Sequence, residues 1–264
     1  EVGMDGARFI DLSVLKGHRL LNLDSEDEGI FLTSCAGGAR VKCRIPVKRA
    51  EFFSSGNRQE DGGKKENADQ VICYEIEIGG LKGGHSGSEI DKERANSNCL
   101  FGRLLWKLSE KMEIGLVSVS GGLADNAIPR QTTAVAAVPK KNSALFADLV
   151  EEVNEQLLDE LAVKDEGYYL HVRELEQKAS RWADGESTKR IAAFLFAAPN
   201  GIQAMSVDIR GLVETSLNLG ILKFTESDPE LLAEFSVRSS VESAKNALID
   251  KLKCVTGLAG GENE

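Results

Sequence analysis

The sequence predicts an α/β (α+β) fold, a two-layer sandwich in which helices cover one face of a mostly antiparallel sheet. Segments with apolar residues at alternate positions, which favour strands, alternate along the chain with segments whose apolar residues recur every three or four positions, which favour helices. Short turns between neighbouring strands indicate hairpins. With 264 residues, 42% of them hydrophobic, the chain can bury a sizeable core. No internal repeat is visible.

The first part of the chain is rich in turns. Residues 1–40 contain short apolar runs on either side of an acidic string, a pattern typical of buried strands that end in loops. Residues 49–70 are mainly Gly, Ser, Asn, Lys and Glu, which predicts a surface insertion. From Val71 to Ile78 apolar and polar residues alternate, which predicts a half-buried strand.

Helices and further strands are expected after residue 92. Helices are expected at about 93–112, at 143–161, at 188–197 and at about 241–256. Strands are expected at 116–120, 132–138, 212–224 and 231–239. Ser143 is the expected N-cap of the second helix, and Leu145 begins its apolar stripe. Residues 167–200 are interpreted as further helical material.

Composition excludes several classes of protein. The net charge is −10 and the basic residues are dispersed, so nucleic acid is not an expected partner. No apolar stretch is long enough to span a membrane. The five cysteines form no CxxC pair, which favours reduced thiols and a cytoplasmic protein. The N-terminus shows no signal peptide. Glu1 lies in the middle of an apparent motif, as if the chain were cut from a longer one.

Two segments could carry chemistry. Asp24 begins the acidic string at the end of a short apolar run, where hard or borderline metal ions find ligands, although a solvated acidic loop is the simpler alternative. His85 lies in the glycine-rich segment Gly79–Gly87. Glycines allow close backbone approach, so this imidazole could reach a ligand as donor or acid. A tight turn with an incidental histidine is an equally good interpretation.

Three residues in a loop or at a strand end could bind a carboxylate or carbonyl group. Asn126 and Arg130 lie in a loop between two expected strands, and Arg238 ends another. A turn containing a proline, and a solvated strand end, are the alternatives.

Taken together, these segments resemble one family, the aminoacyl-histidine dipeptidases (Xaa-His, carnosine-cleaving) of the two-metal M20 metallopeptidases. The segments that carry the resemblance are 1–7 (EVGMDGA), 22–29 (NLDSEDEG), 35–38 (CAGG), 80–87 (GLKGGHSG), 126–130 (NAIPR), 199–201 (PNG) and 213–218 (VETSLN). They occur in the family's order and span nearly the whole chain.

The resemblance implies roles for five residues. Glu1 and Asp24 match ligands of the family's zinc pair, and His85 matches the lid-domain histidine that stabilises the tetrahedral intermediate. Asn126 and Arg238 match lid residues that hold the dipeptide substrate. Residues 1–40 would then be an edge of the metal-binding catalytic domain, and residues 41–264 a lid domain of the M20 dimerisation type.

The family's remaining metal-site motifs are absent from this chain. These are an upstream His-x-Asp motif, the bridging aspartate, the general-base glutamate and a downstream histidine. We therefore expect the missing catalytic-domain segments to be partners of this chain, zinc to bind it weakly at most, and the isolated chain to be inactive. A homodimer through the lid domain is expected. A non-catalytic dimerisation or binding module, or a truncated regulatory homologue, is the alternative.

Overall fold

The structure is a computed structural model that describes residues 9–14, 16–19, 28–29, 34–51, 71–176 and 179–264. The chain divides into two units, Glu1–Cys35 and Ala36–Glu264, which we describe separately. In the first unit a short 3₁₀ helix, η1, covers Leu12–Val14. The expected ligands Glu1 and Asp24 lie outside the described residues.

The second unit contains a large antiparallel sheet, as predicted. Its strands are β1 (Gly37–Pro46), β3 (Val71–Gly79), β5 (Gly115–Gly121), β7 (Thr132–Pro139), β8 (Tyr169–Leu175), β10 (Gly201–Met205), β11 (Val213–Phe224), β12 (Glu230–Ser239) and β13 (Glu262–Asn263). Across the sheet the order is β13-β1-β12-β11-β5-β7-β3-β8, with β10 paired to β11. Two short ribbons join β2 (Arg49–Ala50) to β9 (Trp182–Ala183), and β4 (Gly84–His85) to β6 (Ala127–Ile128).

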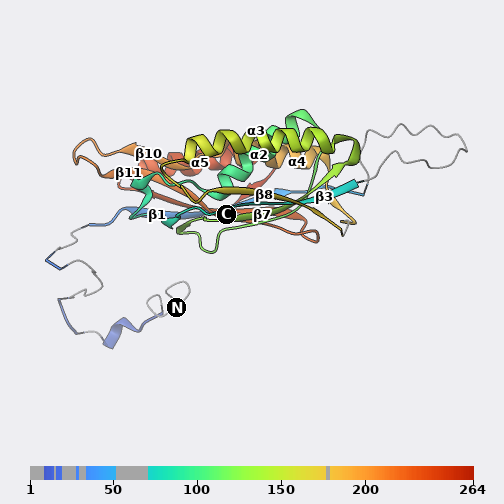
Figure 1. Cartoon of the computed structure of the whole chain (residues 1–264). Helices are drawn as coiled ribbons and strands as arrows, with labels where there is room; N and C mark the ends of the chain where they lie inside the picture. The colour runs from blue at the N-terminus through green and yellow to red at the C-terminus, as the bar shows by residue number, and fades with distance from the viewer. Residues whose placement is uncertain (1–8, 15, 20–27, 30–33, 52–70, 177–178) are drawn as a thin grey trace, which may run out of the picture. The chain divides into compact units, whose positions relative to one another are not determined.

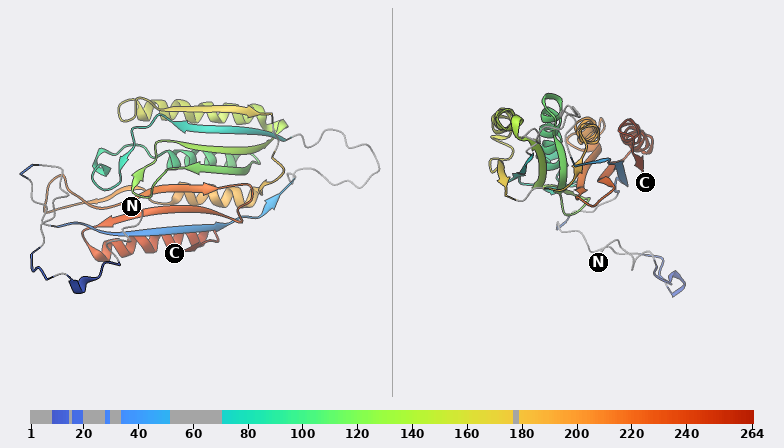
Figure 2. Two further views of the ribbon diagram at one scale, coloured as in Figure 1. Left: turned by 90° about the horizontal axis from the view of Figure 1, so that it is seen from below. Right: turned by 90° about the vertical axis from the view of Figure 1, so that its right-hand side faces the viewer.

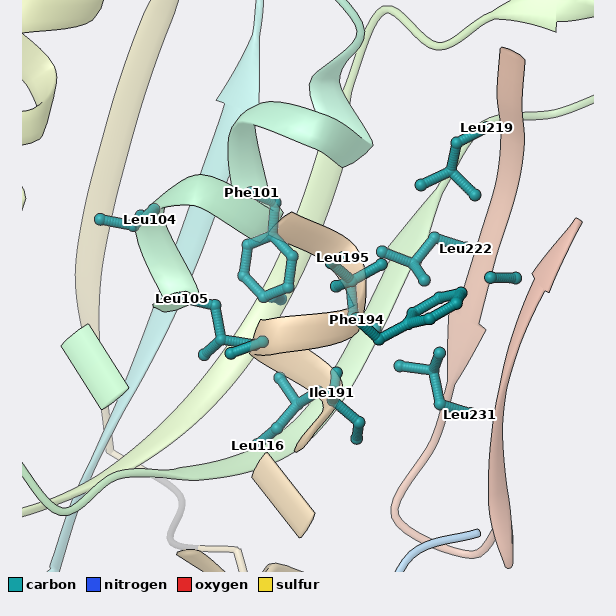
Figure 3. Close-up of a cluster of buried hydrophobic side chains, with 14 of the residues drawn as sticks. Phe101, Leu104, Leu105, Leu116, Ile191, Phe194, Leu195, Leu219, Leu222 and Leu231 are labelled. Carbon is teal, nitrogen blue, oxygen red and sulfur yellow. The ribbon is translucent and has the colours of Figure 1, made fainter. Parts of the chain in front are cut away.

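Four helices cover one face of this sheet, which confirms the predicted two-layer sandwich (Figures 1 and 2). They are α2 (Ser97–Lys111), α3 (Ser143–Leu161), α4 (Gly185–Ala197) and α5 (Glu242–Leu258). Short 3₁₀ helices, η2 (Ile90–Lys92) and η3 (Lys140–Asn142), precede α2 and α3. The core lies between the layers, where side chains of α2 and α4 meet those of β5, β11 and β12 (Figure 3).

Several details differ from the sequence predictions. The first helix begins at Ser97, because the side chain of Asn96 accepts hydrogen bonds from the N–H groups of Asn98 and Cys99 and caps the helix there. Ser143 is the first residue of α3 rather than its N-cap, since η3 already brings the backbone into a helical course. Leu145 is exposed, and its neighbour Phe146 is buried instead.

Residues 169–175 form strand β8 and not a helix. Pairing with β3 over the whole length of β8 overrides the weak local preference of this segment. At the N-terminal side, the domain boundary expected at residue 41 falls inside β1, because β1 pairs with β12 from Gly37 onwards. In the expected insertion, residues 49–50 form β2, and residues 52–70 lie outside the described residues.

The sheet consists of two halves with the same topology. In the first, which we call the inserted half (residues 71–175), the chain runs β3-α2-β5-β7-α3-β8 and the strands lie in the order β5-β7-β3-β8. In the second, the split half (residues 37–50 and 182–264), the chain runs β1-α4-β11-β12-α5-β13 and the strands lie in the order β11-β12-β1-β13. This repeat is not visible in the sequence, since equivalent elements can share a topology without sharing residues.

The two halves are joined side by side. β5 pairs antiparallel with β11, with Gly121 opposite Leu222, and α2 packs against α4 above this junction. The inserted half interrupts the split half between β1 and α4, and the β2–β9 ribbon holds together the two points where the chain leaves and re-enters. Residues far apart in the sequence therefore meet at the junction.

Candidate functional site

His85 lies at the end of the β4–β6 ribbon, on the inserted half. Its imidazole is exposed, and its Nδ1 accepts the backbone N–H groups of Gly87 (3.3 Å) and Ser88 (3.1 Å). The hydroxyl of Ser88 is also 3.1 Å from Nδ1. Because Nδ1 serves as an acceptor, the neutral ring carries its proton on Nε2. The turn therefore presents an N–H donor at the outer edge of the ring.

Glu89, which no motif in the sequence had indicated, fixes the backbone of this turn. Its Oε2 accepts the N–H of His85 at 2.9 Å, and its Oε1 lies 2.6 Å from Nζ of Lys92 and 3.2 Å from Nη1 of Arg94. The hydrogen bond from Lys92, followed by that from the His85 backbone, lowers the pKa of Glu89 to about 2. The only signal in the sequence was an acid four residues after the histidine.

Asn126 lies beside His85, in the loop between β5 and β6. Its side chain is exposed, and its backbone carbonyl oxygen accepts the backbone N–H of Ser86 at 2.8 Å. The buried Asn218 on β11 donates from Nδ2 to the carbonyl oxygens of Asp125 (3.2 Å) and Ala127 (2.8 Å), the two neighbours of Asn126. Asn218 was part of a matching segment in the sequence, but nothing there indicated this contact.

Arg238 approaches the same turn from the split half. It lies near the end of β12, which is flanked by β1 and β11, so the alternative of a solvated edge is wrong. The side chain is half-buried, and its Nε is buried without a hydrogen-bond acceptor among the residues that the structure describes. This guanidinium is therefore free to pair with an anionic group.

Gly87 separates the imidazole from the guanidinium. A Cβ atom added to Gly87 would lie 3.0 Å from Cε1 of His85 and 3.1 Å from Cζ of Arg238. Both side chains therefore pack against this one glycine, and a larger residue would push them apart. The structure thus brings His85, Asn126 and Arg238 together within one chain, across the junction of its two halves.

A cavity of about 790 Å³ opens beside these residues. His85, Glu89, Asn126 and Arg130 line it, together with apolar residues such as Ile128. Its volume lies in the range of small-molecule sites, and its few polar groups converge from two loops. The arrangement could bind a small polar ligand with an anionic end.

The part of the chain that the structure describes offers no metal centre. No group of three or more His, Cys, Asp or Glu side chains gathers there. Of the two expected ligands, neither Glu1 nor Asp24 is described, so their roles stay predictions. The residues described do not fit a pair of zinc ions. Among these residues there is also no helix that is long and apolar enough to cross a membrane.

Comparison with known proteins agrees with this architecture. A model of the M20 peptidase dimerisation domain matches residues 76–165, which lie within the inserted half. The cytosol non-specific dipeptidase of Escherichia coli (strain K12) is 32% identical over 265 residues, covering 100% of this chain and 51% of that protein. The crystal structure of aminoacylhistidine dipeptidase from Vibrio alginolyticus is 32% identical with a TM-score of 0.82, covering 100% of this chain and 50% of that one.

The chain therefore spans about half the length of each of these relatives. Its similarity to both extends over all of its own residues, and its sheet and helices form the dimerisation-domain fold. The chain therefore carries a dimerisation domain of the M20 peptidase type.

Proposed function

We propose that this chain supplies the lid side of a cytoplasmic dipeptidase that hydrolyses Xaa-His dipeptides with two zinc ions. The observation that carries the proposal is that the Nε2–H donor of His85 and the exposed amide of Asn126 line one cavity, while the guanidinium of Arg238 packs against Gly87 beside the imidazole. The names of the two relatives, both dipeptidases, support the reaction class. The zinc ions would be bound largely by segments that this chain lacks, with Glu1 and Asp24 as its own candidate ligands.

Each of the three residues would have a separate task. His85 would donate its Nε2 proton in a hydrogen bond to the oxygen that gains negative charge as the peptide bond is attacked. Asn126 would hold the substrate through its amide. Arg238 would bind the terminal carboxylate of the dipeptide, since a guanidinium can pair with both carboxylate oxygens.

The decisive experiment measures dipeptide hydrolysis by the full-length protein. Replacing His85 with alanine should lower kcat about a hundredfold or more, the usual effect of losing one such donor. His171→Ala is the matched control, because this exposed histidine lies on β8, stacked on Tyr169. Arg238→Lys should mainly raise KM, since an ammonium group cannot pair bidentately. If the His85 and His171 variants have equal rates, the proposal is wrong.

The dimerisation domain itself supports a second candidate, a module that joins subunits without catalysing anything. In both cases we propose a homodimer formed through this domain. The 264-residue chain alone should then form a dimer in solution and show no turnover of an Xaa-His dipeptide with added zinc. Turnover by the isolated chain would contradict its proposed inactivity, and a monomer at all concentrations would contradict the dimer.

A further inference from the structure

We propose that Asp165 is a positioning residue for His85, because its buried carboxylate closes the base of the loop that carries the imidazole. Its Oδ1 accepts the N–H of Lys82 at 2.7 Å, and its Oδ2 accepts the N–H of Ala95 at 2.8 Å. These two residues bracket the loop 82–95, which includes His85. The catalytic consequence of this clamp rests on the function proposed above.

The burial of Asp165 makes this contact unusual. The residue is 0% exposed, and within the described residues neither of its oxygens pairs with a Lys or Arg side chain. Burying a charge without a cationic partner is costly, and backbone N–H groups are then its main compensation. A carboxylate is the side chain that can accept from two donors on opposite sides through two equivalent oxygens. The loop therefore depends on both oxygens at once.

Asp165 is itself held rigidly at the end of α3. Its N–H donates to the carbonyl oxygen of Leu161 at 3.0 Å, and its carbonyl oxygen accepts the N–H of Tyr168 at 2.9 Å. The clamp thus connects the loop to the C-terminal turn of a packed helix. Glu89 and Ser88 fix the imidazole within the loop, whereas Asp165 fixes the loop on the domain.

Because Asp165 would position the imidazole of His85, its loss should change kcat more than KM. A displacement of a catalytic group by about 1 Å can lower a rate about a hundredfold. In Asp165→Asn one acceptor is replaced by an NH₂ group that faces a backbone N–H. We expect this variant of the full-length protein to lose about tenfold to a hundredfold in kcat, with KM within about twofold of the unchanged protein.

Two measurements separate positioning from a general loss of structure. The first is amide hydrogen exchange in the 264-residue chain. In Asp165→Asn the amide of Lys82 or Ala95 should exchange about tenfold faster, and the imidazole signals of His85 in the NMR spectrum should shift. Asp159→Asn is the control, because this aspartate is exposed on α3. Unchanged exchange and unchanged His85 signals in Asp165→Asn overturn the inference, whatever the protein catalyses.

The second measurement is a double-mutant cycle in the full-length protein. If Asp165 acts through His85, then Asp165→Asn should change kcat by less than about twofold once His85 is already alanine. An equal loss in both backgrounds overturns the positioning role. If the unsubstituted protein hydrolyses no dipeptide, the proposed function fails, and the exchange and imidazole signals alone decide whether Asp165 positions His85.

Discussion

Replacing Gly102 with alanine should destabilise the protein, although alanine is the better helix former. Gly102 lies in α2 where this helix faces α4, and a Cβ atom there would lie 2.7 Å from Cβ and 3.1 Å from the carbonyl carbon of Leu195. Alanine gains about 0.5–1 kcal/mol over glycine within a helix. Overpacking a filled core costs about 1–3 kcal/mol. Because backbone atoms of α4 block the methyl group, we expect a net loss of about 0.5–2 kcal/mol.

Gly257→Ala is the matched control, because this glycine lies in α5 with nothing within 4 Å of the added Cβ. Equilibrium unfolding in urea and thermal melting both report the difference. For a unit of this size, 1 kcal/mol corresponds to about 2–4 °C in Tm. The Gly102 variant should melt below the unchanged protein, and the Gly257 variant at or above it. A Gly102→Ala protein as stable as the original would refute the close packing of α2 on α4.

Three further predictions concern the site and the thiols. Asn218→Leu should lower the free energy of unfolding by about 3 kcal/mol, because the carbonyl oxygens of Asp125 and Ala127 lose their donor. A urea midpoint within error of the original would contradict this. The pKa of Glu89 is lowered from 4.5 to about 2. Its contribution to the stability of the folded turn is therefore present above pH 4.5 and is lost as the pH falls towards 2. The amide protection factor of His85 should therefore fall over this interval, but stay flat in Glu89→Gln; equal curves would exclude the contact. Desolvation raises the pKa of the partly buried Cys99 to about 12, so at about pH 8 Ellman's reagent should label exposed Cys254 much faster than Cys99. Equal labelling rates of the two thiols, measured by mass spectrometry, would contradict this shift.

The residues of the candidate site come from both halves of the sheet. His85 and Asn126 belong to the inserted half, and Arg238 and Asn218 belong to the split half, yet all four lie at one junction. A single chain therefore brings both sides of this group together without a contribution from another subunit.

Local patterns predicted most of the elements correctly. The alternation of apolar and polar residues in 71–78 follows from the pleat of a strand. The helix expected at about 93–112 follows from the helical repeat of its apolar residues, of which Leu104 and Leu108 are buried. Both are properties of a few neighbouring residues. The glycines around His85 likewise indicated an unusual turn before its geometry was known. β8 was missed because an edge strand is stabilised mainly by its neighbour, which lies far away in the sequence.

The fold class, the helical stripes and the residue types of the site could all be predicted from local residue patterns. The folded chain was needed to show that the sheet is two copies of one topology, that Arg238 reaches the turn of His85, and that Asp165 and Asn218 hold the two loops. The physical reason is that periodicity and turn chemistry are local, whereas a hydrogen bond to a backbone group or a contact across β5 and β11 depends on how distant segments pair. Such pairing leaves no pattern in the residues on either side.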